Sequence, residues 1–190
     1  TAGRITGLNY HHNTYIIMEK VGIFYGPAGG RTENVAKRLG ELLGEENHDL
    51  VSLDRADIAD LHKYRNIIFG IATIGKETWD AEPLESGWFD FLPELEKAKL
   101  EGRKIAIYGL GDHVRWPRQF VDAMGQLYEV LKQKGLDTVA KVSPDDYTFD
   151  ESEALVNGIF VGLPIDEDFQ PDLTDERITR WVDQLCREFE

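Results

Sequence analysis

The chain has 190 residues, enough for one domain with a sizeable hydrophobic core. Its 35 acidic residues outnumber 21 basic ones, and the formal net charge of −14 argues against a nucleic-acid partner. No apolar run approaches the length of a membrane-spanning helix, and a single cysteine, Cys186, excludes an internal disulfide framework and favours the cytoplasm.

The acidic surface is compatible with attraction of a basic protein partner, and equally with simple solubility. Cys186 falls in a helical pattern, which is typical of a residue that fills space in the core or on the surface rather than of a nucleophile. Residues 1–17 show no clear period and precede Met18, which leads directly into the first apolar run. We therefore expect residues 1–17 to be upstream or added sequence without a signal peptide, and residues 18–190 to form the domain.

Strand-like and helix-like patterns alternate along the chain. Strands are predicted at residues 21–25, 50–53, 67–70, 105–109, 139–142 and 159–163. Helices are predicted at residues 32–43, 85–97, 117–134 and 174–189, with a short helical segment at 58–64. The central apolar runs do not alternate with polar residues, which indicates parallel strands covered on both faces. The sequence therefore predicts a doubly wound α/β sheet in one domain.

Three loops follow the carboxyl ends of predicted strands, at residues 26–31, 71–83 and 110–118. In a doubly wound sheet, ligands bind outside these strand ends. We therefore expect the three loops to converge on one site.

The first loop has the order strand, glycine-rich turn, helix, which aims main-chain N–H groups and a helix dipole at one point. The predicted phosphate donors are the N–H groups of Ala28, Gly29, Gly30 and Arg31 and the hydroxyl of Thr32. Pro27 offers no N–H. The loop lacks the endings of a P-loop and of a dinucleotide fingerprint, and the alternative is an ordinary tight turn before a helix.

The second and third loops carry apolar and aromatic residues that could sandwich a flat heterocycle. Trp79 and Trp116 could instead be surface-to-core anchors, and the sequence leaves both readings open. Asp112 could accept a hydrogen bond from a ring N–H or cap its own turn. His113 is expected to be a solvated loop residue, and the scattered histidines predict no metal cluster.

The chain from Lys20 to Glu188 resembles the flavodoxins, in particular their long-chain branch. The motifs that carry this resemblance are residues 24–26, 109–112, 145–149, 157–163, 166–168, 173–178 and 181–182. The resemblance implies a five-stranded parallel sheet with helices on both faces. It also implies that the last strand is interrupted by a long insertion between Val142 and Ile159.

The resemblance implies non-covalent FMN and one-electron transfer between a reductase and acceptor redox enzymes, in a monomer that is not itself an enzyme. Its implied phosphate-binding residues are Pro27, Ala28, Gly29, Gly30, Arg31 and Thr32. Its implied residues around the flavin are Ala72, Thr73, Ile74, Gly75, Gly109, Leu110, Gly111, Asp112, Trp116, Gln119 and Asp122. Ile74 and Trp116 would pack on the two faces of the flavin, Gly75 would face its N5 atom and Asp112 would lie near its pyrimidine edge. The expected protein partners form transient complexes and present basic docking surfaces. Neither nucleic acid nor a membrane is expected as a partner.

The first loop departs from the family, which usually places hydroxyl residues where this chain has Pro27 and Gly29. The loss of two hydrogen bonds to a charged group, at about 1.5–3 kcal/mol each, would weaken FMN binding by two or more orders of magnitude. Arg31 and the helix dipole would offset part of this loss. The alternative function is therefore a binding or regulatory module of the same fold with weak or lost FMN binding. An FMN-dependent reductase would need a second substrate pocket, which the sequence does not reveal.

Overall fold

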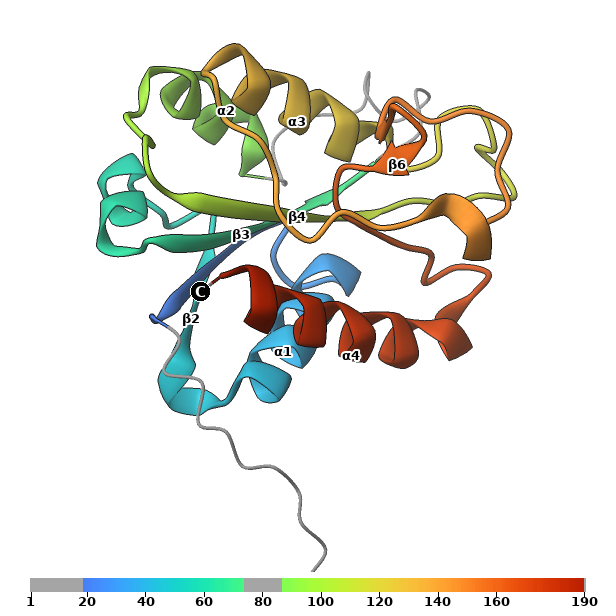
Figure 1. The fold of residues 1–190 in the computed structure, drawn as a ribbon, viewed down its shortest axis with the longest axis horizontal. Coiled ribbons are helices and arrows are strands. Elements are labelled where there is room, and N and C mark those ends of the chain that lie inside the picture. The colour runs from blue at the N-terminus through green and yellow to red at the C-terminus, as the bar shows by residue number, and fades with distance from the viewer. Residues whose placement is uncertain (1–18, 74–86, 190) are drawn as a thin grey trace, which may run out of the picture.

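The main sheet of the computed structural model, which describes residues 19–73 and 87–189, has five parallel strands (Figure 1). Their order in the sheet is β2-β1-β3-β4-β7. The strands are β1 (Val21–Gly26), β2 (His48–Ser52), β3 (Asn66–Ala72), β4 (Lys104–Leu110) and β7 (Leu163–Ile165). The predicted doubly wound parallel sheet is confirmed, while the prediction for residues 1–17 falls outside the described residues.

Two helices cover each face of the sheet. Helices α1 (Arg31–Leu43) and α4 (Pro171–Glu188) lie on one face, and α2 (Trp88–Lys97) and α3 (Asp122–Gln133) on the other (Figure 1). The short 3-10 helices are η1 (Glu45–Asn47), η2 (Ile58–Lys63) and η5 (Pro144–Asp146). Among the described residues, no helix combines the length and the apolar character needed to cross a membrane.

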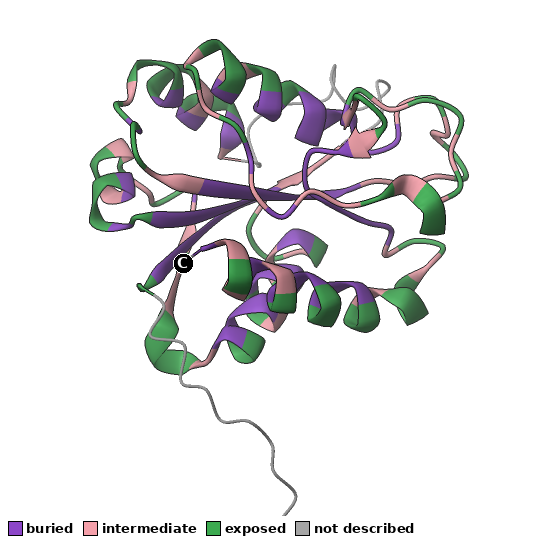
Figure 2. Cartoon of the chain, in the orientation of Figure 1, coloured by how far each residue is buried: buried purple, intermediate pink, exposed green. Residues whose placement is uncertain are grey.

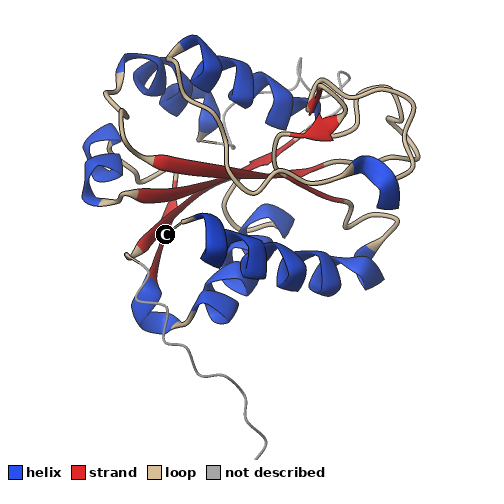
Figure 3. Ribbon diagram, in the orientation of Figure 1, coloured by secondary structure: helices blue, strands red, loops and turns tan. Residues whose placement is uncertain are grey.

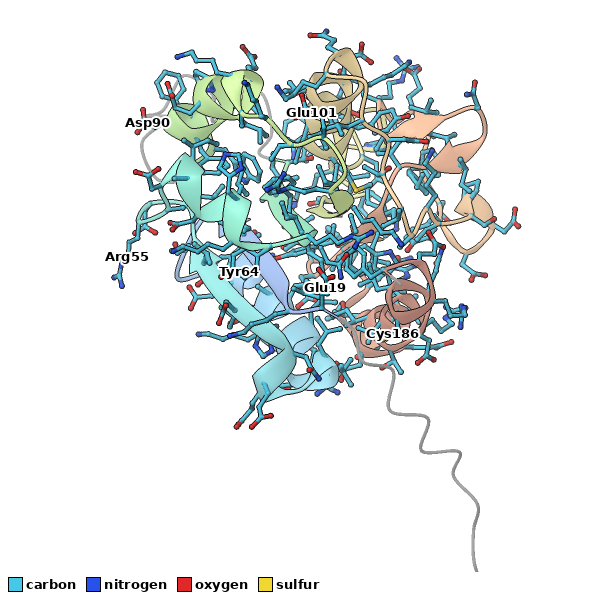
Figure 4. The ribbon with its side chains drawn as sticks, turned by 60° about the vertical axis from the view of Figure 1, so that its left-hand side comes forward. Glu19, Arg55, Tyr64, Asp90, Glu101 and Cys186 are labelled. Carbon is cyan, nitrogen blue, oxygen red and sulfur yellow. The ribbon has the colours of Figure 1, made fainter. Side chains whose placement is uncertain are left out.

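The core is divided by the sheet into two clusters because successive strand residues point to opposite faces. Phe24, Phe69 and Ile107 pack with α2 and α3, whereas Ile23 and Tyr108 pack with α1 and α4. The central strands are buried over nearly their whole length (Figure 2). This two-sided burial explains why their sequences lack an apolar–polar alternation. Cys186 is a half-buried cysteine on α4 that packs against the cluster shared with α1, in agreement with its predicted space-filling role (Figure 4).

The first and last residues of several helices and strands differ from the prediction. Helix α3 begins at Asp122 instead of residue 117, and the preceding residues form turns (Figure 3). Val121 precedes the helix with φ of +51°, a left-handed conformation that a β-branched residue rarely adopts. A periodic sequence pattern does not reveal such a break, so the predicted helix was too long at its start.

The last strand is interrupted, as the resemblance implies. Thr138 pairs with Ile105, and Leu163 pairs with Tyr108 of the same β4, so the segment between them leaves the main sheet. Two predicted strands were nevertheless wrong. Residues 139–142 form no strand, because Ala140 has φ of +53° and Val142 makes only an isolated antiparallel bridge.

The prediction at 159–163 merged two separate elements. Strand β6 (Ile159–Phe160) pairs with β5 (Leu155–Val156) in a small antiparallel sheet, and only β7 continues the main sheet. Gly162 separates β6 from β7, and a Cβ there would lie 2.0 Å from the carbonyl oxygen of Ile107. The chain therefore crosses β4 at a distance that only glycine permits.

Candidate functional site

The carboxyl ends of the strands lie at one edge of the sheet. Gly26 at the end of β1 is in register with Ile71, and Ala72 at the end of β3 is in register with Leu110. Leu110 in turn is in register with Ile165 of β7. The loops that follow these strands therefore leave the sheet at the same level, where the sequence places its candidate ligand site.

The first loop ends at an uncapped helix. Gly30 is the N-cap of α1, and no side chain caps that end. The first N–H groups of a helix have no partner within it, so they are free to bind an anion. Gly29 adopts φ of +74°, and a Cβ at Gly29 or Gly30 would meet nothing within 4 Å. The side-chain directions of both glycines therefore border open space beside an uncapped helix start, which is compatible with a phosphate cradle.

The remaining first-loop residues lie around this cradle. Pro27 is half-buried, and Ala28 and Arg31 are exposed. Thr32 is buried in the first turn of α1, and its carbonyl accepts a 2.7 Å hydrogen bond from the hydroxyl of Tyr108 on β4. The start of α1 is therefore fixed to the centre of the sheet.

Two carboxylates also approach this loop. Glu33, in the first turn of α1, accepts a hydrogen bond from the Gly29 N–H and pairs with Lys37 at 2.7 Å. Hydrogen bonding from Lys37, and then from Gly29, lowers the pKa of Glu33, so the carboxylate is charged at neutral pH. Arg31 forms an ion pair with Asp168. An incoming phosphate therefore meets one donor already engaged and a cation already paired.

Sequence reasoning missed both carboxylates. The position of Glu33, three residues after the N-cap, is typical of a capping glutamate and could have been recognised. Asp168 lies 137 residues from Arg31 in the sequence, and only the fold brings the two together.

The described part of the second loop is held by one main-chain and one side-chain hydrogen bond of Thr73. Thr73 donates its N–H to the Leu110 carbonyl at 2.8 Å, and its hydroxyl accepts the Ala123 N–H at 3.0 Å. Ala72 is half-buried at the end of β3. Ile74, Gly75 and Trp79 lie outside the described residues.

In the third loop, Asp112 caps its own turn. Its Oδ1 accepts the N–H groups of Val114 at 2.9 Å and Arg115 at 2.7 Å, and its Oδ2 lies 3.5 Å from the Arg115 guanidinium. Of the two readings left open by the sequence, the structure shows the cap. Trp116 and Gln119 follow as half-buried residues joined by a 3.1 Å main-chain hydrogen bond.

The expectation that His113 is a solvated loop residue is wrong. Its side chain is only 16% exposed, and its Nδ1 pairs with the fully buried carboxylate of Asp166. The rings of Phe120 and Phe169 approach it edge-on. The sequence could not reveal this, because the partner lies 53 residues away.

Asp166 connects the third loop to the turn after β7. Its carboxylate also accepts the N–H groups of His113 at 3.0 Å and of Asp168 and Phe169 at 2.9 Å. Burial alone would raise the pKa of Asp166, but the hydrogen bonds from His113, Phe169 and Asp168 outweigh it and hold the pKa below its ordinary value. Because this turn carries the partner of Arg31, the first and third loops belong to one connected network.

The other candidate residues lie where elements pack closely. A Cβ at Gly109 would lie 2.8 Å from the Cβ of Met124, and one at Gly111 would lie 2.8 Å from the Val121 nitrogen. Asp122 is buried, and its Oδ1 accepts the Glu153 N–H at 2.8 Å. These three residues hold α3 and the long insertion against the end of β4. Within residues 19–73 and 87–189, no group of three or more potential metal ligands occurs.

Comparison with known proteins gives a consistent result. A protein-family model described as flavodoxin matches residues 23–181. Flavodoxin 1 of Azotobacter vinelandii is 42% identical over 176 residues, covering 90% of this chain and 98% of that protein. A flavodoxin of Nostoc sp. is 41% identical over 171 residues, with the same coverages of 90% and 98%.

A solved structure agrees with these relatives. The crystal structure of Fusobacterium nucleatum flavodoxin bound to flavin mononucleotide superposes on this chain with a TM-score of 0.79 at 26% identity. The match covers 91% of this chain and 100% of the other. The similarity therefore extends over most of the chain.

Proposed function

Because this chain belongs to the flavodoxin family, we propose that it carries single electrons on non-covalently bound FMN, from a reductase to acceptor redox enzymes. Flavodoxins are electron-transfer flavoproteins and not enzymes in their own right, so no nucleophile or general base is needed. The observation that carries the proposal is the uncapped start of α1, beside the open side-chain directions of Gly29 and Gly30.

These residues fit the phosphate of FMN. The N–H groups of residues 28–31 and the Thr32 hydroxyl would bind it, and the positive end of the α1 dipole would favour its charge. Gly29 and Gly30 leave the room that such an approach requires. Glu33 would release the Gly29 N–H when the phosphate binds. When bound, FMN supplies the one-electron chemistry that the protein residues lack.

The flavin ring would lie between the second and third loops. Trp116 and Ile74 would pack on its two faces, with Gly75 beside N5. Trp116 is half-buried, so part of its surface is accessible. The turn capped by Asp112 would place Trp116 and Gln119, while Thr73 and Asp122 would hold the loops in register through Ala123 and Glu153. Ala72, Gly109, Leu110 and Gly111 would form the floor at the sheet edge.

The charge of the chain suggests its partners. A net charge of −14 would attract redox proteins with basic docking surfaces and give short-lived complexes that weaken as salt rises. We expect a monomer that works in the cytoplasm, in keeping with a single cysteine and a reducing compartment.

Spectroelectrochemical titration of the FMN-loaded protein tests the proposed function. A one-electron carrier gives two separate waves of one electron each, with the second at low potential. A single two-electron wave would contradict a carrier role and favour a reductase. A protein that retains no FMN would be a binding module of the same fold.

A further inference from the structure

A second pocket lies away from the flavin site, between α4 and the segment that begins the long insertion. Its volume is about 210 Å³, and its lining contains Lys141, Asp146, Arg177, Arg180 and Trp181. None of its lining residues belongs to the three loops at the carboxyl edge of the sheet. A ligand held there would therefore be independent of the flavin.

The walls of this pocket are fixed by hydrogen bonds. Arg177, Trp181 and Gln184 recur at helical spacing and so share one face of α4. The Trp181 indole donates to the Ala140 carbonyl at 2.7 Å, and the Gln184 amide donates to the Lys141 carbonyl at 3.0 Å. The opposite wall is thereby attached to the helix at two successive residues, so the pocket is part of the folded architecture.

Arg177 is a buried cation surrounded by neutral partners. Its residue is 4% exposed, and its guanidinium donates to the Gln170 side-chain oxygen at 2.9 Å and to the Asp146 carbonyl at 3.1 Å. It also lies 4.2 Å above the ring of Tyr147. Within the described part of the chain, no carboxylate forms an ion pair with Arg177. A buried guanidinium without a counter-ion favours an anion at its open side.

The other two cations have weak partners. Lys141 pairs with Asp137 at 2.9 Å, and Arg180 pairs with Asp146 at 3.4 Å and Glu176 at 3.5 Å. The Arg180 side chain is 58% exposed. The exposed ion pairs of Arg180 contribute little to stability, so Arg180 could turn toward a better ligand at little cost. The Lys141 ammonium lies 5.8 Å from the centre of the Tyr128 ring, and neither Tyr128 nor Asp137 lines the pocket, so the charge of Lys141 is held outside.

The charge of the lining is opposite to that of the whole protein. Two arginines and one carboxylate, that of Asp146, belong to the lining, whereas the chain carries a net charge of −14. We propose that this pocket binds a compact anion whose phosphate or carboxylate oxygens contact Arg177 and Arg180. The volume suits a small metabolite better than a nucleotide.

The test follows the Trp181 indole N–H by two-dimensional NMR of the protein in excess FMN, which keeps added phosphate out of the flavin cradle. Inorganic phosphate and succinate are titrated separately, each at constant ionic strength. Either probe should shift the Trp181 resonance and saturate at one ligand per protein. The probe that saturates at the lower concentration identifies the preferred head group.

Variants connect the binding to the cations. Arg180→Gln should raise the Kd by about tenfold or more, as expected for loss of a charge-assisted hydrogen bond. Arg187→Gln is the matched control, because Arg187 is an exposed arginine of α4 that does not line the pocket. The proposal is overturned if neither probe saturates, if sodium chloride produces the same shifts, or if Arg187→Gln weakens binding as much as Arg180→Gln.

Discussion

Substitution of Gly29 by alanine tests the role of this residue in phosphate binding separately from its contribution to the stability of the fold. Gly29 has φ of +74°, and the added Cβ would meet nothing within 4 Å. The cost to the apoprotein is therefore conformational alone, about 1–2 kcal/mol for an L-residue in the left-handed region. For a domain of this size that corresponds to a fall in Tm of roughly 2–8 °C.

Gly135→Ala is the matched control. Gly135 has φ of +75° and an equally open Cβ direction, but it follows α3 and lies outside the three loops. Both variants should lose the same stability. Only Gly29→Ala should also weaken FMN binding, because strain at φ of +74° would displace the main-chain N–H groups proposed to hold the phosphate. We expect at least a tenfold rise in Kd, or about 1.4 kcal/mol.

Thermal unfolding of the two apoproteins and FMN fluorescence titration provide the measurements. The reasoning would be refuted if Gly29→Ala bound FMN as tightly as the unmodified chain while losing the stability expected from its backbone. A loss of stability far larger than that of Gly135→Ala would show that the space above Gly29 is not open.

Three further predictions concern the same edge of the sheet. Glu33→Gln should tighten FMN binding several-fold by freeing the Gly29 N–H, and should lower apoprotein stability by up to about 1 kcal/mol because an acid is lost from the first turn of α1. FMN titration measures the first effect and urea unfolding the second. The control Glu41→Gln, on the same helix, should leave FMN affinity unchanged. The pKa of Asp166 is held below its ordinary value, so its contribution to stability is present above the unfolded pKa of about 3.9 and is lost as the pH falls through the folded value. Asp166→Asn should therefore reduce stability at pH 7 and flatten its acid dependence, as urea unfolding at several pH values would show. Trp116→Ala should raise the Kd for FMN by about tenfold through loss of ring stacking, whereas Trp116→Phe should stay within about threefold; equal effects of the two would contradict a stacking role.

The sequence predicts the regular parts of the fold because they follow local rules. β1, β3 and β4 are continuous apolar runs, and such runs are typical of strands buried on both faces. The last strand does not follow these rules. Residues 139–142 have strand composition, yet Ala140 in a left-handed conformation and the bridge from Val142 to Phe160 direct the segment out of the sheet.

The candidate site shows the same division between local and distant information. The glycine-rich turn and the cap formed by Asp112 involve neighbouring residues, so the sequence indicates both. The pairs of His113 with Asp166 and of Arg31 with Asp168 join residues 53 and 137 positions apart. No spacing rule within one sequence identifies such partners, and the polarity of His113 alone suggested an exposed side chain.

Comparative titration of the apoprotein with FMN and with riboflavin tests the central claim most directly, because the two ligands differ only in the phosphate. If main-chain donors at the start of α1 hold that group, FMN fluorescence is quenched at a 1:1 ratio and riboflavin binds at least about 100-fold more weakly. Equal affinities for the two ligands, or no quenching at micromolar FMN, would contradict the account.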